Sequence, residues 1–300
     1  MNYEEITVKS RDGYELDVRV YDTPSPRAAV KFIHGMEEHQ DRYVPFASFL
    51  RDSGYAVITS DMRGHGKKAP LLSHIADRDG DRLLIEDEEA VLSLIRGRYP
   101  GVPVFLFAHS MGTIIARRLL QTRSGDFSKA ALSGYPNPNP AAGAGIALCG
   151  ITGTFRGRKG HSALLDSMVL GGFSKAVPNA ETPLDWLSFD RDNVRRYSED
   201  PLCGVPFTIG SYDALMRLIR DIGNPALYRD VNTALPILLI SGIDDPCTGG
   251  EKGRQASLDV LRRAGFACID TVTLDGMRHE ILNESAKDQV FSRILSFFEA

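Results

Sequence analysis

The sequence predicts an α/β protein with a mostly parallel sheet of eight strands, helices on both faces of the sheet, and an inserted helical lid. Three observations lead to this prediction. Short apolar runs bounded by turn residues alternate with helical patterns up to residue 135 and again from residue 233. Residues 136–232 carry helical patterns but no convincing buried strand. One buried strand passes directly into a helix, with Ser110 at the turn between them.

The strands and helices are expected in the following order. The first two strands form an antiparallel hairpin at residues 4–10 and 14–22, because the Arg-Asp-Gly of residues 11–13 supplies the turn chemistry. The other strands are short apolar runs at residues 28–33, 55–60, 104–108, 129–134, 236–242 and 267–274. Helical patterns lie at residues 42–53, 81–98, 113–121, 250–264 and 284–298. Strands that alternate with helices pair in parallel, because a parallel connection needs a long crossover.

The break in this alternation defines two parts. We expect a core built from residues 1–135 and 233–300, and a helical lid of residues 136–232 that is inserted between two strands of the core sheet. The chain contains no internal repeat and no low-complexity tract.

The composition excludes several classes of function. The 300 residues carry a formal charge of −4, from 35 Lys and Arg against 39 Asp and Glu, which favours neither nucleic acid nor an anionic membrane as a partner. No apolar run approaches the roughly 18 residues that an integral membrane segment needs. The expected partner is a small molecule, and association between copies of the chain stays open.

The cysteines and the N-terminus point to one compartment. Cys149, Cys203, Cys247 and Cys268 are far apart and form no C-x-x-C pair, which argues against a disulfide framework or a zinc site. The first residues lack the basic and apolar regions of a signal segment. We therefore expect a cytoplasmic protein, and no cofactor or metal ion.

The turn after the buried strand has the features of a nucleophile elbow. Residues 104–108 are apolar, Ser110 stands at the turn, and a helical pattern follows at once. Such a strained turn requires small residues two positions before and after the serine, here Ala108 and Gly112. The usual pattern has glycine at both positions, so Ala108 departs from it by one methyl group. The alternative is an ordinary loop serine.

A serine nucleophile needs a base and an orienting carboxylate, and in such sheets both lie after the ends of parallel strands. His279 follows the last expected strand, and Asp244 and Asp245 follow the strand before it. Asp245 is preferred because it precedes a proline, which favours an extended backbone. Ser110, Asp245 and His279 then stand in the chain order of α/β-hydrolase triads, with Asp244 as the alternative acid.

Two backbone N–H groups are expected to form an oxyanion hole. Met111 follows the serine at the start of a helix, and Met36 lies in the loop after an early strand. Donors of this kind typically stabilise the transition state by roughly 3–4 kcal/mol each. Because they act through the backbone, the methionine side chains need not matter.

Five motifs resemble the monoglyceride lipase and lysophospholipase branch of the α/β-hydrolases. They are His34-Gly-Met-Glu-Glu-His39 with Arg42-Tyr43, Asp61-Met-Arg-Gly-His-Gly66, Ala108-His-Ser-Met-Gly112, Gly242-Ile-Asp-Asp-Pro246 and Arg278-His-Glu280. The resemblance spans residues 25–299. It implies the α/β-hydrolase fold and the hydrolysis of a small-molecule acyl ester, such as a monoacylglycerol or a lysophospholipid, through an acyl-enzyme.

Two features set this chain apart within the resemblance. Glu37 stands where many members have glycine, beside the expected oxyanion donor, so it can alter what the mouth of the site accepts. The lid contains Asp185-Trp-Leu-Ser188, which resembles a bacterial subgroup. Two apolar stretches of the lid, residues 164–173 and 215–219, either form an acyl-chain pocket above Ser110 or pack the lid onto the sheet.

Several other residues are expected to be structural. His34, His65 and His109 lie at strand ends and are expected to hold loops by hydrogen bonds. Cys247 is expected to be a buried thiol. Glu280 is expected either to support the site or to start a helix.

Two other functions stay open. An amidase or peptidase on the same fold would need a site for the substrate amine, for example from the acidic lid residues Glu181 or Asp185. A non-catalytic ligand-binding protein with a hydrolase fold is the second, because a fold does not imply a function. Epoxide hydrolysis is disfavoured, because that chemistry wants a carboxylate at the elbow and Ser110 is found there.

Overall fold

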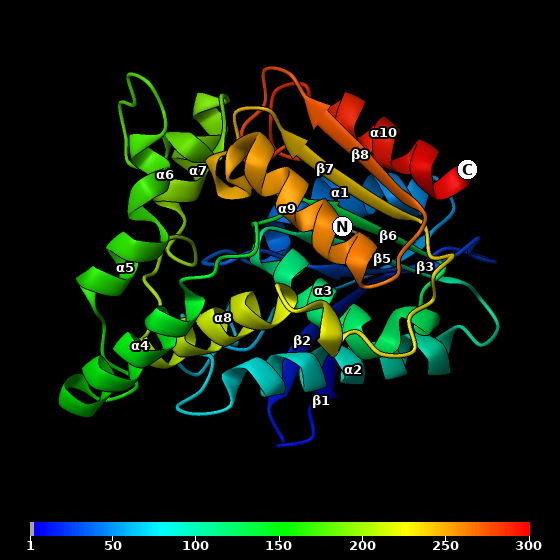
Figure 1. Ribbon diagram of the computed structural model, residues 1–300. Helices are drawn as coiled ribbons and strands as arrows, with labels where there is room; N and C mark the ends of the chain where they lie inside the picture. The colour runs from blue at the N-terminus through cyan, green and yellow to red at the C-terminus, as the bar shows by residue number, and fades with distance from the viewer. Residues whose placement is uncertain (1–2) are drawn as a thin grey trace.

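The computed structural model describes residues 3–300 and contains one eight-stranded sheet in the order β1-β2-β4-β3-β5-β6-β7-β8 (Figure 1). The strands are β1 (Glu4–Lys9), β2 (Glu15–Tyr21), β3 (Ala29–Ile33), β4 (Ala56–Ser60), β5 (Val104–His109), β6 (Lys129–Ser133), β7 (Ile237–Gly242) and β8 (Ile269–Leu274). β2 pairs antiparallel with β1 and β4, and every other neighbouring pair is parallel. The predicted mostly parallel eight-stranded sheet is therefore confirmed; residues 1 and 2 lie outside the described residues.

Helices cover both faces of the sheet, as predicted. They are α1 (Val44–Asp52), α2 (Gly80–Arg98), α3 (Met111–Arg123), α4 (Ala142–Arg156), α5 (Ala163–Val169), α6 (Gly171–Lys175), α7 (Arg191–Glu199), α8 (Ile209–Ile222), α9 (Gly250–Arg263) and α10 (Lys287–Glu299). α1 and α10 pack on one face, and α2, α3, α8 and α9 contribute to the apolar core on the other. Two separate apolar cores therefore flank the sheet.

Strand β5 lies near the middle of the sheet because both of its faces are apolar. Leu106 and Ala108 face the core under α2 and α3, whereas Phe105 and Phe107 face the core under α1 and α10. Adjacent residues of a strand point to opposite faces, so a continuous apolar run is what a strand between two helical layers requires. Ser110 directly follows the carboxyl end of this strand.

The helices α4 to α8 follow β6 and precede β7, and α4 to α7 lie beyond one end of the sheet, in green at the left of Figure 1. α8 is a 14-residue helix that packs against α4 and also against α2 and α3. The last helix of the segment 136–232 is thus in contact with the helical layer of the sheet. The division into a core and a lid stays a prediction.

The C-terminal helix begins later than its pattern suggested. The expected helix starts at residue 284, whereas α10 starts at Lys287. The reason is that the carboxylate of Glu284 accepts the backbone N–H groups of Arg278, Phe189 and Asp190. This residue fastens the loop before the helix instead of entering it.

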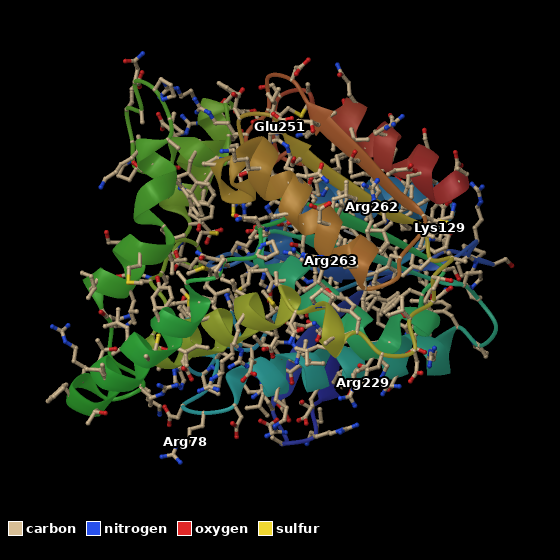
Figure 2. All side chains as sticks on the ribbon, viewed as in Figure 1. Arg78, Lys129, Arg229, Glu251, Arg262 and Arg263 are labelled. Carbon is tan, nitrogen blue, oxygen red and sulfur yellow. The ribbon has the colours of Figure 1, made fainter. Side chains whose placement is uncertain are left out.

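Charged side chains of both signs lie on the outside of the molecule. On α9, Glu251, Arg262 and Arg263 are exposed on the side away from the sheet (Figure 2). Within residues 3–300, none of the helices combines the length and the apolar character that crossing a bilayer requires.

Candidate active site

Ser110 lies between β5 and α3 on a turn with a strained backbone. Its φ of 52° and ψ of −124° place it in a region that residues other than glycine rarely adopt. The N–H of Ser110 donates to the carbonyl of Ser133 at 2.9 Å. Gly112 has no room for a side chain, because a Cβ there would collide with the carbonyl oxygens of Ile33 and His34. The small residue two positions after the serine is therefore required by the close approach of α3 to the end of β3.

Asp245 and His279 lie after the ends of β7 and β8, and both are buried next to Ser110. The Nε2 atom of His279 is 2.8 Å from Ser110 Oγ, and its Nδ1 atom is 3.0 Å from Asp245 Oδ2. The second oxygen of Asp245 accepts the N–H of Cys247 at 2.8 Å. Asp244, the alternative acid, is exposed. The structure thus brings the three predicted side chains into one hydrogen-bonded series.

The surroundings of His279 favour its charged form. The imidazole is 2% exposed and lies between the rings of His109 and Trp186, with centroids 4.7 and 4.9 Å away. Burial lowers the pKa of His279, but the Asp245 carboxylate, by its charge and its hydrogen bond, raises it, and the pKa ends above the ordinary 6.5. His279 can therefore accept a proton while it stays fixed in orientation.

Met36 and Met111 lie beside Ser110 in the wall of a cavity. Met111 is the first residue of α3, so its N–H is one of the free donors at the start of a helix. A Cβ on Gly35 would stand 3.1 Å from the Cβ of Ser110, so the backbone before Met36 passes close to the serine. Within residues 3–300 neither methionine N–H donates to another backbone carbonyl.

The cavity above Ser110 has a volume of about 620 Å³ and mostly apolar walls. Apolar side chains from the segment 136–232 line it, among them Leu170, Phe173, Trp186, Leu215, Met216 and Ile219. Leu218 instead points into the core, and Leu164 is 56% exposed. The two apolar stretches of the sequence thus divide between a pocket and ordinary packing. The volume is sufficient for an acyl chain.

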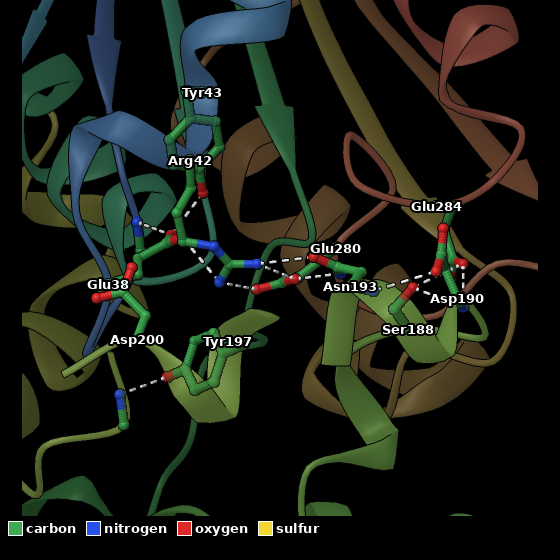
Figure 3. A network of polar contacts seen from close by, with 12 residues as sticks. Glu38, Arg42, Tyr43, Ser188, Asp190, Asn193, Tyr197, Asp200, Glu280 and Glu284 are labelled. Atoms are coloured by element: carbon green, nitrogen blue, oxygen red, sulfur yellow. Dashed lines mark hydrogen bonds and ion pairs between the residues drawn. The ribbon is translucent and has the colours of Figure 1, made fainter. Parts of the chain in front are cut away.

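A buried charge network joins the loop after β3 to α7 and to the segment that carries His279 (Figure 3). The Arg42 guanidinium donates to both carboxylate oxygens of Glu280, at 2.7 and 2.6 Å, and to Asn193 at 3.0 Å. Glu38 lies 3.6 Å from Arg42 and accepts from the Tyr43 hydroxyl at 2.5 Å. Two carboxylates around one guanidinium hold its pKa above the usual range. Glu280 therefore supports the site and starts no helix.

A second set of contacts ties the segment before α7 to the loop after β8. The Glu284 carboxylate accepts from the hydroxyl of Ser188 at 2.7 Å and from the N–H of Phe189 at 3.0 Å (Figure 3). The N–H of Glu280 donates to the carbonyl of Leu187 at 2.7 Å. Trp186, which precedes these residues, is thereby held against His279. Sequence reasoning missed Glu284, because most of its partners lie about a hundred positions away and no local pattern marks them.

The three histidines at strand ends all have hydrogen-bond partners. His34 Nε2 accepts the N–H of Met62 at 3.0 Å, and His65 lies 3.1 Å from the carbonyl of Arg63. His109 lies 3.3 Å from the hydroxyl of Ser133. These contacts agree with the expectation that the three histidines form hydrogen bonds at strand ends.

Two groups of side chains bring three metal-ligand types together within residues 3–300. They are His39, Asp200 and Cys203, and Asp245, Cys247 and His279. In each group the histidine is already paired with the aspartate, at 2.8 Å in the first and 3.0 Å in the second. Burial raises the pKa of both cysteines, which keeps them as thiols. The donor atoms therefore suit hydrogen-bonded pairs better than a metal ion. Cys247 is buried, as expected.

Comparison with known proteins places this chain in a family. The family model described as Hydrolase_4, serine aminopeptidase S33, matches residues 24–286. A monoacylglycerol lipase of Mycolicibacterium smegmatis is 26% identical over 286 residues, which cover 93% of this chain and 91% of the relative. Human monoglyceride lipase is 28% identical over 252 residues, 78% of this chain and 71% of the relative.

Solved structures agree with the sequence relatives. A thermostable carboxyl esterase from Bacillus coagulans, solved with glycerol, superposes with a TM-score of 0.91 at 27% identity, over 100% of this chain and 98% of the esterase. A lipase in an open form superposes with a TM-score of 0.88 at 24% identity and supports the fold. The chain therefore has the α/β-hydrolase fold, and it belongs to the Hydrolase_4 (serine aminopeptidase, S33) family.

Proposed function

We propose that this protein hydrolyses small acyl esters, such as monoacylglycerols or lysophospholipids, with Ser110 as nucleophile, His279 as base and Asp245 as orienting acid. The observation that carries the proposal is the series of two contacts, 2.8 Å from Ser110 Oγ to His279 Nε2 and 3.0 Å from His279 Nδ1 to Asp245 Oδ2. Similarity over nearly the whole chain to a lipase and to an esterase supports carboxylic ester hydrolysis by this protein.

The proposed reaction has two halves. His279 takes the proton of Ser110 as the Ser110 oxygen attacks the ester carbonyl, and the Met36 and Met111 N–H groups stabilise the oxyanion. His279 then gives the proton to the leaving alcohol, which leaves an acyl-enzyme. A water molecule, deprotonated by His279, attacks the acyl-enzyme, and His279 returns the proton to Ser110 Oγ as the acid is released. Asp245 holds the imidazole and stabilises its charged form.

The cavity supports an ester with an apolar acyl part. Its walls carry Phe173 and Leu215 and end at Ser110, so a chain can lie in it with its carbonyl at the nucleophile. We further infer that residues 136–232 act as a lid, because they supply much of this wall. A peptidase site on the two acidic lid residues is not supported. Glu181 pairs with Arg191, Asp185 accepts from Thr182, and neither lines the cavity.

Replacement of the nucleophile tests the proposal. Ser110→Ala should lower kcat for a 4-nitrophenyl ester by about 10⁴–10⁶-fold, while circular dichroism shows an unchanged fold. A variant that turns over the ester at the rate of the parent would refute the proposal. A panel of monoacylglycerols, lysophospholipids and simple esters of graded chain length would then identify the preferred ester.

A further inference from the structure

We propose that Glu37, Asp166 and Tyr212 form a subsite for a positively charged ammonium group in the wall of the active-site cavity. The inference rests on the proposed ester hydrolysis and adds a substrate class to it, namely esters that carry an ammonium group within reach of this cluster. All three side chains line the same cavity as Ser110. They come from the loop after β3, from α5 and from α8.

Glu37 is held in an unfavourable backbone conformation that directs its side chain into the cavity. Its φ is 54°, a left-handed value that is costly for a residue with a Cβ. Its carbonyl accepts the N–H of Gly204 at 2.9 Å and the hydroxyl of Tyr197 at 2.9 Å. The carboxyl oxygen Oε1 accepts the N–H of Phe207 at 3.2 Å. The surrounding chain thus stabilises a strained, 7% exposed acid at the position where the family resemblance expects glycine.

The other two members of the cluster carry polar atoms without a partner. Tyr212 is fully buried, and its hydroxyl makes no hydrogen bond within residues 3–300. The Oδ1 atom of Asp166 is also buried and unpaired there. Burial raises the pKa of Tyr212, and a side-chain contact with Asp166 raises it further, although the geometry of that contact is too poor to pair the Tyr212 hydroxyl fully. Unpaired buried polar atoms are costly, so a ligand that pairs with them gains that free energy.

No positively charged side chain of the described residues faces the cluster. The titratable groups that face Glu37 are Asp166 from α5, Tyr212 from α8 and Tyr197 from α7, none of which is a cation. In the described chain neither carboxylate forms an ion pair with a lysine, an arginine or a histidine. Burial, and to a lesser extent Asp166, raises the pKa of Glu37 to about 8. Glu37 therefore holds a proton at neutral pH.

An ammonium group fits this arrangement better than a hydroxyl group does. Its N–H groups can donate to Asp166 Oδ1 and to Glu37, and its positive charge favours the ionised form of both carboxyl groups. Binding of an ammonium group would release the proton of Glu37 to the solvent. A hydroxyl group is neutral and would not cause this release. The Tyr212 ring adds an aromatic surface next to the cation. Proton release is therefore a signature that separates the two ligand types.

Calorimetry on Ser110→Ala protein tests the subsite without any turnover. Hexylammonium and 1-hexanol are titrated at pH 7.0 in phosphate and in HEPES, whose ionisation enthalpies differ. We expect hexylammonium to bind at least tenfold more tightly than 1-hexanol and to release nearly one proton per site. Tyr212→Phe should weaken hexylammonium binding by a factor smaller than this tenfold difference.

Two further variants in the same background complete the test. Glu37→Gln should abolish both the tenfold preference and the proton release, with thermal melting to show that it folds. Asp244→Asn makes the same change from a carboxyl to an amide group at an exposed position outside the cavity, so it should keep both the preference and the proton release. Equal affinities for the amine and the alcohol, or a preference that survives in Glu37→Gln, would overturn the subsite. Failure of the proposed hydrolysis would appear separately, as unchanged ester turnover by Ser110→Ala.

Discussion

His279 is fixed on three sides by residues that differ in what they do to its charge. Asp245 holds the Nδ1 atom at 3.0 Å, while His109 and Trp186 lie against the ring. Burial, and the charge on His279, lower the pKa of His109 far below its ordinary range. The two neighbouring imidazoles therefore differ in charge. His109 stays neutral, whereas the surroundings of His279 favour its protonated form.

The activity should rise with pH as His279 loses its proton. Because the pKa of His279 is raised, the expected inflection of kcat/KM lies above pH 6.5. The indole face of Trp186 stabilises the imidazolium by about 0.5–1 kcal/mol, so Trp186→Leu should lower the inflection by about 0.4–0.7 pH unit. A pH profile of kcat/KM for a 4-nitrophenyl ester measures both values.

A second readout separates the titration of His279 from changes in substrate binding. Trp186 is the single tryptophan of the chain, and a charged imidazole quenches the fluorescence of a neighbouring indole. Emission in Ser110→Ala should therefore decrease on acidification, with the same inflection as the kinetics. A profile that is flat between pH 5 and 8 in both readouts would contradict the assignment of His279 as the base.

Contacts between elements position the serine. α3 approaches the end of β3 so closely that Gly112 lies against the carbonyl oxygens of Ile33 and His34. The charge network of Arg42 and Glu280 holds α7 against the loops that carry the site. The turn of Ser110 and the loop of Met36 are thus held close to each other.

A methyl group at this contact should push the two elements apart. Gly112→Ala should lower the free energy of unfolding by about 1–3 kcal/mol, because the added Cβ overpacks against backbone that cannot move aside, and it should lower kcat as well. Gly97→Ala is the matched control. It lies exposed in α2 with no atom near its added Cβ, and should stabilise by about 0.5–1 kcal/mol. Urea unfolding measures the free energy of unfolding of each variant. Equal stability for the two variants would argue against a close contact.

For the molecule as a whole, the sheet was predictable from sequence because each strand is marked by residues within the strand and next to it. Apolar runs such as residues 104–108 specify buried strands by themselves, and turn residues bound them. Asp245 and His279 were predictable because strand ends converge at one edge of the sheet. The surroundings of Glu37 were not, because Asp166 and Tyr212 reach it from helices that follow more than a hundred residues later. Their positions depend on how the segment 136–232 packs.

The buried Glu37 should make the stability of the whole protein depend on pH. Its pKa is about 8 in the folded state against an ordinary 4.5, so its stabilising contribution is complete below pH 4.5 and is lost as the pH rises to about 8. The Tm of Glu37→Gln relative to the parent should therefore increase from pH 5 to pH 8 and level off above it. Thermal melts at four pH values measure this difference. A difference that stays constant from pH 5 to 9 would contradict a buried, protonated Glu37.

Covalent labelling of the folded protein tests the central claim, that Ser110 is activated by His279, most directly. The parent is treated with a fluorophosphonate probe, digested and analysed by mass spectrometry, together with Ser110→Ala and His279→Gln. We expect one adduct per chain in the parent, on the peptide that contains Ser110, none in Ser110→Ala, and labelling at least a hundredfold slower in His279→Gln. An adduct on a different serine, or equal labelling rates in the parent and in His279→Gln, would contradict the account.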